Sequence, residues 1–131
     1  MTTDLRSFNS IRDFIQLAIK SWKQKIIKQC REKCVITGNW RFCEVHHCSS
    51  SFDSILRLTF DITGIPFRQQ TYEYTEAELA LLRTTCLALH SDVTGALVSS
   101  RLHILYHQQY QESTIGNWKE FKAGWKKKKT A

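Results

Sequence analysis

Apolar residues recur at helical spacing along most of this chain, and this pattern limits any sheet to short strands. From Phe8 to Ile27 the apolar residues fall mostly three or four positions apart, with lysines on the opposite face. Such spacing is typical of an amphipathic helix. It predicts one long helix over about residues 8–32, with Ser7 as a plausible N-cap.

Four later segments also have helical patterns. A short helix is expected in "SFDSILRLTFDITG", which ends at Gly64 with Pro66 just beyond. In "TEAELALLRTTCLALH", Thr75 precedes Glu78 by three residues, which is the capping-box pattern. A helix in "RLHILYHQQYQ" can be capped by Ser99 or Ser100, and "GNWKEFKAGW" predicts a final helix before a lysine-rich tail.

Extended structure is expected mainly between the first two helices. "CVITG" is rich in β-branched residues and "WRFCEVHH" resumes an extended pattern after Gly38 and Asn39. These segments predict two short strands, or a strand and a loop. The expected fold is therefore a small, mostly helical α+β domain.

The chain length fits one domain over residues 1–131. No apolar run approaches the roughly 20 residues of a membrane-spanning helix, and the first ten residues lack the layout of a secretory signal. We therefore expect a soluble protein in the cytoplasm that does not associate with membranes.

The five cysteines predict reduced thiols rather than disulfides, because their number is odd and they form no compact framework. A structural zinc on Cys30, Cys34, Cys43 and Cys48 is a less favoured alternative, since their spacing lacks C-x-x-C pairs. Cys86 lies on the apolar stripe of its predicted helix and is expected in the core.

Clustered positive charge indicates a polyanionic partner. The net charge is +7, and the region from Lys20 to Arg41 holds seven basic residues against one acidic residue, Glu32. Counterion release favours binding of such clusters to nucleic acid, although a solvated lysine face is an equally good interpretation of charge runs alone. The predicted contacts to double-stranded DNA are Lys20, Lys23, Lys25, Lys28, Arg31, Arg41, Arg101, Lys126, Lys127 and Lys128.

Four of the five histidines form two tight pairs. His103 and His107 are four residues apart and share a helix face, so both can reach one metal ion. His46 and His47 are neighbours at the end of a predicted strand and point to opposite faces. His46 can complete a set of three metal ligands, while His47 remains available as a general base.

These segments resemble the HNH nucleases, also called ββα-metal or His-Me finger nucleases, and particularly the small phage homing endonucleases. The resemblance rests on "CVITGNWRFCEVHHCSSSF" and "LHSDVTGALVSSRLHILYHQQY", with weaker similarity in the flanks "SWKQKIIKQCREKC" and "NWKEFKAGW". It runs from about Trp22 to Trp125. It implies a basic N-terminal helix over 8–32, a ββα-metal core with inserted helices over 34–110, and a C-terminal helix with a lysine-rich tail over 116–131.

The resemblance also implies roles for individual residues. His47 would be the catalytic base, and His46, His103 and His107 would bind one divalent metal ion, whether magnesium, manganese, zinc or nickel. His90 or Thr94 would fill the middle position of the family motif, which steadies the base through a backbone contact. The chain departs from many phage members in having His46 where they have aspartate and histidine where they have a helical asparagine.

The implied activity is metal-dependent hydrolysis of DNA phosphodiester bonds by a phage homing or nicking endonuclease. Two other functions are open from the residues alone. One is a non-catalytic DNA-binding module whose histidines hold a structural zinc, and the other is an inactive relative that acts as a protein partner.

Overall fold

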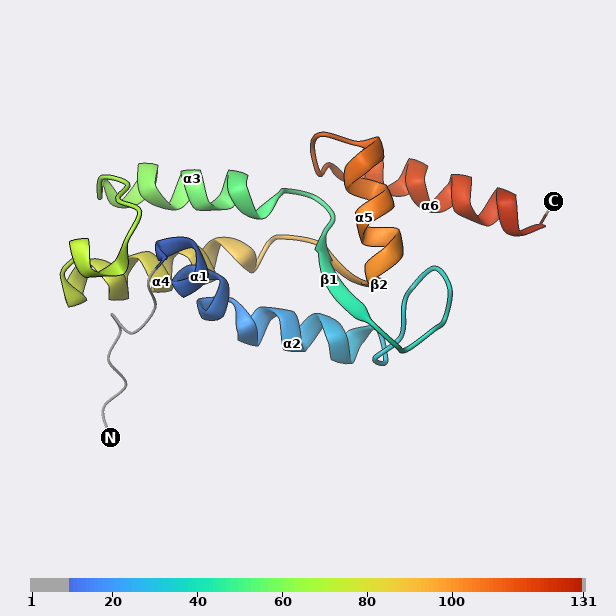
Figure 1. Cartoon of the computed structure of the whole chain (residues 1–131), viewed down its shortest axis with the longest axis horizontal. Helices are drawn as coiled ribbons and strands as arrows, with labels where there is room; N and C mark the ends of the chain where they lie inside the picture. Colours follow the sequence, from blue (N-terminus) through green and yellow to red (C-terminus); the bar gives the residue numbers. More distant parts are fainter. Residues whose placement is uncertain (1–9, 131) are drawn as a thin grey trace. The chain divides into compact units, whose positions relative to one another are not determined.

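The computed structural model describes residues 10–130, with side chains described up to residue 125. Within this range the structure is mostly helical, with one two-stranded antiparallel sheet (Figure 1). The predicted α+β class is confirmed. The elements are α1 (Ile11–Ala18), α2 (Lys20–Gln29), β1 (Cys43–His47), α3 (Phe52–Thr63), the 3₁₀ turn η1 (Thr71–Glu73), α4 (Glu76–His90), β2 (Gly95–Ser99), α5 (Ser100–Gln109) and α6 (Ile115–Thr130).

The described chain forms two compact units. The first takes in residues 10–22 and 53–92, and so contains α1, α3 and α4. The second takes in residues 23–52 and 93–130, and contains β1, β2, α5, α6 and most of α2. Helices α3 and α4 are thus inserted in the sequence between the two strands that pair in the second unit. The prediction of a single domain over 1–131 stays a prediction.

The prediction of one continuous helix over 8–32 is wrong. Helix α1 ends at Ala18, Ile19 leaves helical geometry, and α2 begins at Lys20. Periodicity reports which face of a segment is buried, and one non-helical residue between two helices leaves that period unchanged. Ser10 caps α1 by accepting hydrogen bonds from the amides of Arg12 and Asp13, whereas the predicted cap, Ser7, lies outside the described residues.

The other helical predictions are confirmed. Helix α3 ends just before Gly64, which has a positive φ of 70°. Thr75 and Glu78 form the expected capping box on α4, and Ser99 caps α5 by accepting a hydrogen bond from the amide of Leu102. None of the described helices combines the length and the apolar character needed to cross a membrane.

Strands β1 and β2 pair so that His46 lies opposite Ala96 and His47 opposite Gly95. Of the two predicted alternatives for the segment before β1, the strand and loop is confirmed: "CVITG" forms a turn, and only residues 43–47 form a strand. The amide of Val35 donates to the carbonyl of Leu97, which ties this turn to β2.

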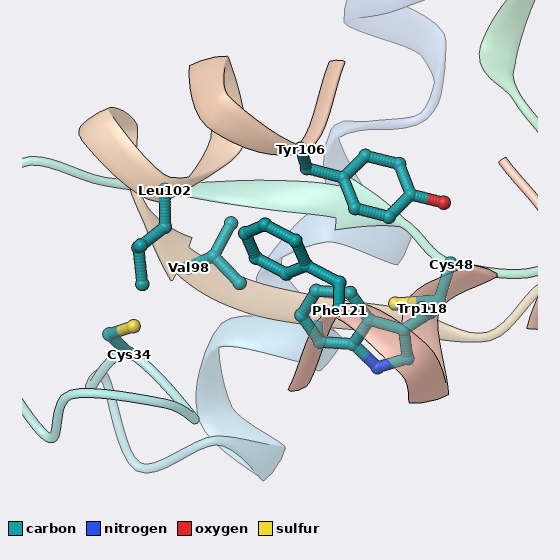
Figure 2. Close-up of a cluster of buried hydrophobic side chains, with 8 residues drawn as sticks. Cys34, Cys48, Val98, Leu102, Tyr106, Trp118 and Phe121 are labelled. Carbon is teal, nitrogen blue, oxygen red and sulfur yellow. The ribbon is translucent and has the colours of Figure 1, made fainter. Parts of the chain in front are cut away.

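The core of the second unit joins β2, α5 and α6. Figure 2 shows Tyr106 of α5 close to Trp118 and Phe121 of α6, with Val98 and Leu102 beside them. The rings of Tyr106 and Phe121 meet edge to face with centroids 5.4 Å apart. This packing places one face of α5 against the strands. The predicted burial of Cys86 is confirmed, and Trp22 and Trp118 are also buried.

Helix α2 ends in a left-handed turn built without glycine. Arg31 and Glu32 have φ values of 57° and 61°, and the amides of Glu32 and Arg31 donate to the carbonyls of Ile27 and Lys28. This is the Schellman arrangement, in which glycine usually occupies the position held here by Arg31. A side chain at positive φ costs about 1 kcal/mol or more.

Arg31→Gly should therefore raise the free energy of unfolding by about 1 kcal/mol, because glycine adopts this conformation without the steric cost. The matched control is Lys25→Gly on the exposed face of α2, which should lower stability by about 1 kcal/mol. Urea unfolding followed by circular dichroism measures both. Equal losses of stability in the two variants would contradict the assignment of strain to Arg31.

Candidate metal centre

Strand β1 separates the two adjacent histidines. His46 is 1% exposed and packs edge to face on Tyr106 of α5, with ring centroids 4.2 Å apart. His47 is half-buried, and its ring lies 6.0 Å from that of Phe52. Successive side chains on a strand point to opposite faces. The two imidazoles therefore have different surroundings, as the sequence predicted.

Helix α5 brings two more imidazoles to His46. Leu102 and Tyr106 are buried in the core of the second unit, and His103 and His107 each follow one of them in the sequence. The ring centroids of His103 and His107 lie 5.1 Å and 5.5 Å from that of His46. Because Leu102 and Tyr106 are buried in the core, the adjacent face of α5, which carries His103 and His107, lies beside β1.

His46, His103 and His107 together could hold a metal ion. Each offers one ring nitrogen, and these three atoms all lie within 4.8 Å of one another. Over the part of the chain that the structure describes, no other group of three or more histidine, cysteine or acidic residues meets this condition. The three predicted metal ligands are therefore brought together.

The imidazole of His46 is buried without a hydrogen-bond partner in the described part of the chain. Neither Nδ1 nor Nε2 has one among the described residues, although both nitrogens are inaccessible to solvent. Such a group normally costs about 1–3 kcal/mol. Burial, with a further contribution from the neighbouring His103, His107 and His47, lowers the pKa of His46 to about 3. The ring is neutral at physiological pH, which is the form that binds metals.

A carboxylate orients the second ligand. His103 Nδ1 lies 3.2 Å from Glu44 Oε1, and His103 Nε2 lies 3.0 Å from His107 Nε2. If Nδ1–H donates to Glu44, the Nε2 lone pair of His103 points to the cluster. Metal-binding histidines usually donate the N–H of their other ring nitrogen to a carboxylate in this way.

The third ligand, His107, also has a lowered pKa. Burial lowers it most, and the neighbouring His103 lowers it further.

The donor set fits a divalent ion with an open coordination position. Zinc–nitrogen bonds of about 2.0–2.1 Å in a tetrahedral site place two ligand nitrogens about 3.3 Å apart, close to the 3.0 Å between His103 Nε2 and His107 Nε2. Three protein ligands are typical of catalytic sites, whereas structural sites have four. His107 is exposed, so the cluster is reachable from solvent.

His47 lies next to a backbone contact between the two strands. The amide of Cys48 donates to the carbonyl of Thr94 at 2.8 Å, and the amide of Thr94 donates to Ser49 Oγ at 2.9 Å. These bonds hold the chain directly after His47. Thr94 thus has a backbone contact with the residue after His47. Its assignment to the middle position of the family motif stays a prediction.

His90 lies in the first unit, at the end of α4. It is fully buried, its Nδ1 lies 2.7 Å from the carbonyl of Cys86, and its ring contacts Trp22 edge to face. These contacts are typical of a histidine within a packed core. Its predicted catalytic role stays a prediction.

The predicted DNA contacts are distributed over several elements. Lys25 and Lys28 are exposed on α2, Arg31 and Arg41 lie exposed in the connection between α2 and β1, and Arg101 is exposed on α5. Lys20 is exposed in the first unit, and Lys23 is half-buried. The side chains of Lys126, Lys127 and Lys128 lie outside the described part of the structure. Binding of DNA by these residues stays a prediction.

The cysteines do not form a second metal cluster among the described residues. All five are free thiols, and burial raises the pKa of Cys48 to about 12. Cys34 and Cys48 pack as small apolar side chains in the core around Tyr106.

Sequence reasoning missed Glu44 as part of the site. The sequence does indicate that Glu44 lies near His46, because the two residues are two positions apart on one predicted strand and therefore share a face. Its partner, however, is on α5, 59 residues later. Only the pairing of the two segments reveals that contact.

Comparisons with known proteins identify no relative. No family model matches the chain, and no curated protein or solved structure matches it either.

The lowered pKa of His46 predicts a pH dependence of stability in the metal-free protein. Between about pH 6.5 and pH 3, an unfolded histidine binds a proton that folded His46 does not. The free energy of unfolding should therefore decrease as the pH falls through this window. Urea titrations in EDTA at several pH values should show a slope that is smaller in His46→Leu, by up to about 1.4 kcal/mol per pH unit. Parallel curves for the two proteins would contradict the expected contribution.

The contact between Glu44 and His103 predicts a role in metal affinity. Glu44→Gln removes the charge that orients His103, and it should weaken zinc or nickel binding by roughly 10- to 100-fold. Glu112→Gln is the matched control, because Glu112 is exposed and its hydrogen bonds use the backbone carbonyl. Competition with a chromophoric chelator measures both affinities. Equal metal affinities in the two variants would show that Glu44 does not contribute to metal binding.

Proposed function

We propose that this protein is a metal-dependent DNA endonuclease of the HNH type. The observation that supports this most is the divergence of two adjacent histidines at the end of β1. His46 belongs to the three-imidazole cluster, while His47 lies outside it and is half-buried. Metal-dependent hydrolysis of a phosphodiester uses a cation site and a separate base, and this arrangement offers candidates for both at one strand end.

His47 is the general base in this proposal. A histidine has a pKa near 6.5 when unperturbed, so it can accept a proton from water near neutral pH. Strand pairing at Gly95 and the bond from Cys48 to Thr94 hold the backbone on both sides of His47. This restraint supports a fixed direction for proton transfer. The activated water would attack phosphorus, leaving a 5′-phosphate and a 3′-hydroxyl.

His46, His103 and His107 hold the divalent ion in this proposal, with Glu44 orienting His103. The bound ion would supply positive charge for the developing charge on the phosphate and on the leaving oxygen. An all-imidazole set favours zinc or nickel over magnesium, which prefers oxygen ligands.

The β1–β2–α5 order supports the resemblance seen in the sequence. A histidine pair at the end of the first strand, an antiparallel second strand and a helix with HxxxH follow in that order. This is the order expected of a ββα-metal motif. We therefore retain the phage homing or nicking endonuclease as the specific proposal, with double-stranded DNA as substrate.

Exposed cations support a DNA partner. Lys25 and Lys28 of α2, together with Arg31 and Arg41, belong to the same unit as the histidine cluster. Phosphate contacts by such residues orient a duplex without reading its sequence.

Replacement of His47 tests the proposal. His47→Ala should reduce cleavage of supercoiled plasmid by at least about 100-fold, with metal binding and DNA binding nearly unchanged. The assay is run with Mg²⁺, Mn²⁺, Zn²⁺ and Ni²⁺ in turn. His46→Ala is the comparison, because it should lose both metal binding and cleavage.

Two results would contradict the proposal. If the wild-type protein nicks no DNA with any of the four metals, an inactive relative is favoured. If His47→Ala removes the metal or unfolds the protein, the histidines have a structural role, as in a non-catalytic DNA-binding module.

A further inference from the structure

A second surface of the second unit combines exposed aromatic rings with positive charge. It is a pocket of about 580 Å³, lined mainly by the connection between α2 and β1. We call it the aromatic–basic pocket. Its lining includes Arg31, Glu32, Lys33, Trp40 and Phe42.

Two large aromatic side chains remain exposed here. Trp40 is 64% exposed and Phe42 is 84% exposed. Trp22 and Trp118, by contrast, are buried. Single exposed apolar residues are common, but two aromatic rings lining one pocket form a patch of the kind that marks binding sites.

Cations surround these rings. Arg31 and Lys33 line the pocket, and the guanidinium carbon of Arg41 lies 5.1 Å from the centroid of the Trp40 ring. Glu32 is the acidic residue in the lining. The pocket therefore combines π-faces with excess positive charge, and this combination suits a nucleotide, which has a flat base and an anionic phosphate.

The backbone of Phe42 is strained, and its side chain is exposed to solvent. Its φ is 52°, which is unusual for a bulky residue. Its carbonyl accepts hydrogen bonds from both the amide and the hydroxyl of Ser100, each at 2.7 Å. Asn39 is fixed nearby, since its carbonyl accepts from the amide of Cys34 at 2.7 Å. Strain held by such contacts is typical of ligand-binding segments.

The pocket is connected to the histidine site by β1. Phe42 directly precedes β1 and His47 ends it. Five residues of extended chain span about 16 Å, or roughly five nucleotide steps of a B-form strand. One DNA strand could therefore contact both sites.

We propose that the aromatic–basic pocket binds an unpaired nucleotide of the DNA substrate. The base stacks on Trp40 or Phe42, and the flanking phosphates contact Arg31, Lys33 and Arg41. This inference rests on the proposed DNA endonuclease function and narrows its substrate to DNA with an unpaired base, such as a gap, a branch or a locally opened duplex.

The test compares two fluorescent DNA probes of identical sequence, one fully paired and one with a short single-stranded gap. Binding is measured by anisotropy in EDTA, so that cleavage plays no part. The double variant Trp40→Ala/Phe42→Ala should bind gapped DNA roughly 10- to 100-fold more weakly. Its affinity for the paired probe should stay within about twofold of the wild-type value, since paired bases cannot stack on the pocket.

Matched variants isolate the stacking contribution. Tyr72→Ala removes a ring that is 71% exposed in the first unit, and it should leave both affinities unchanged. Trp40→Phe keeps an aromatic face and should retain most of the affinity for gapped DNA. In the wild type, gapped DNA should quench the fluorescence of exposed Trp40, and this quenching should disappear in Trp40→Phe. Circular dichroism and zinc titration of each variant verify that the second unit remains folded.

Unchanged binding of gapped DNA by the double variant, or an equal loss for both probes, would overturn the inference. If the wild type also cleaves plasmid, the inference alone fails and the endonuclease proposal stands. If the wild type binds neither probe, the DNA partner itself is wrong. Binding of an acidic, aromatic peptide in place of gapped DNA, lost in the double variant, would assign the pocket to a protein partner.

Discussion

The ring of His46 is buried with no partner for its nitrogens among the described residues, and this is the constraint on which the second unit depends. A neutral imidazole with two unsatisfied nitrogens destabilises a core, and a leucine or phenylalanine would fill the same space without that cost. Tyr106 and Trp118 nevertheless pack around it, with ring centroids 4.2 Å and 5.0 Å away. The arrangement is understandable if a ligand completes the site, because a metal ion bound by His46, His103 and His107 would satisfy a buried nitrogen and recover part of the free energy.

The geometry of strand β1 gives its neighbouring residues different roles, because successive side chains point to opposite faces. His46 and His47 are adjacent in sequence, yet β1 turns one towards α5 and the other away from it. Glu44 shares the face of His46 and reaches His103. A five-residue strand thus supplies a candidate ligand, a residue that orients another ligand and a candidate base. A shift of one residue in strand register would exchange the two faces, so the pairing of His47 with Gly95 is as important to the site as the histidines themselves.

Strain and exposed apolar surface occur together around the connection between α2 and β1. The described non-glycine residues with positive φ are Arg31, Glu32 and Phe42, and all three line the aromatic–basic pocket. Glycine would relieve strain at each position, but it would remove a cation at Arg31 and an aromatic ring at Phe42. Stability and ligand binding therefore favour different residues here, a conflict that is common at binding sites.

Much of this protein could be predicted from local patterns in its sequence. Helical periodicity located α3, α4, α5 and α6, the capping pattern located the start of α4, and the spacing of His103 and His107 placed them on one helix face. Periodicity could not locate the break at Ile19, because the buried face continues through it. Local patterns also could not reveal the contact of Glu44 with His103 or the exposure of Trp40. Nor could they reveal that His46 has no hydrogen-bond partner among the described residues. These depend on residues distant in sequence, and only the packing of α5 against paired β1 and β2 decides which side chains meet and which remain exposed.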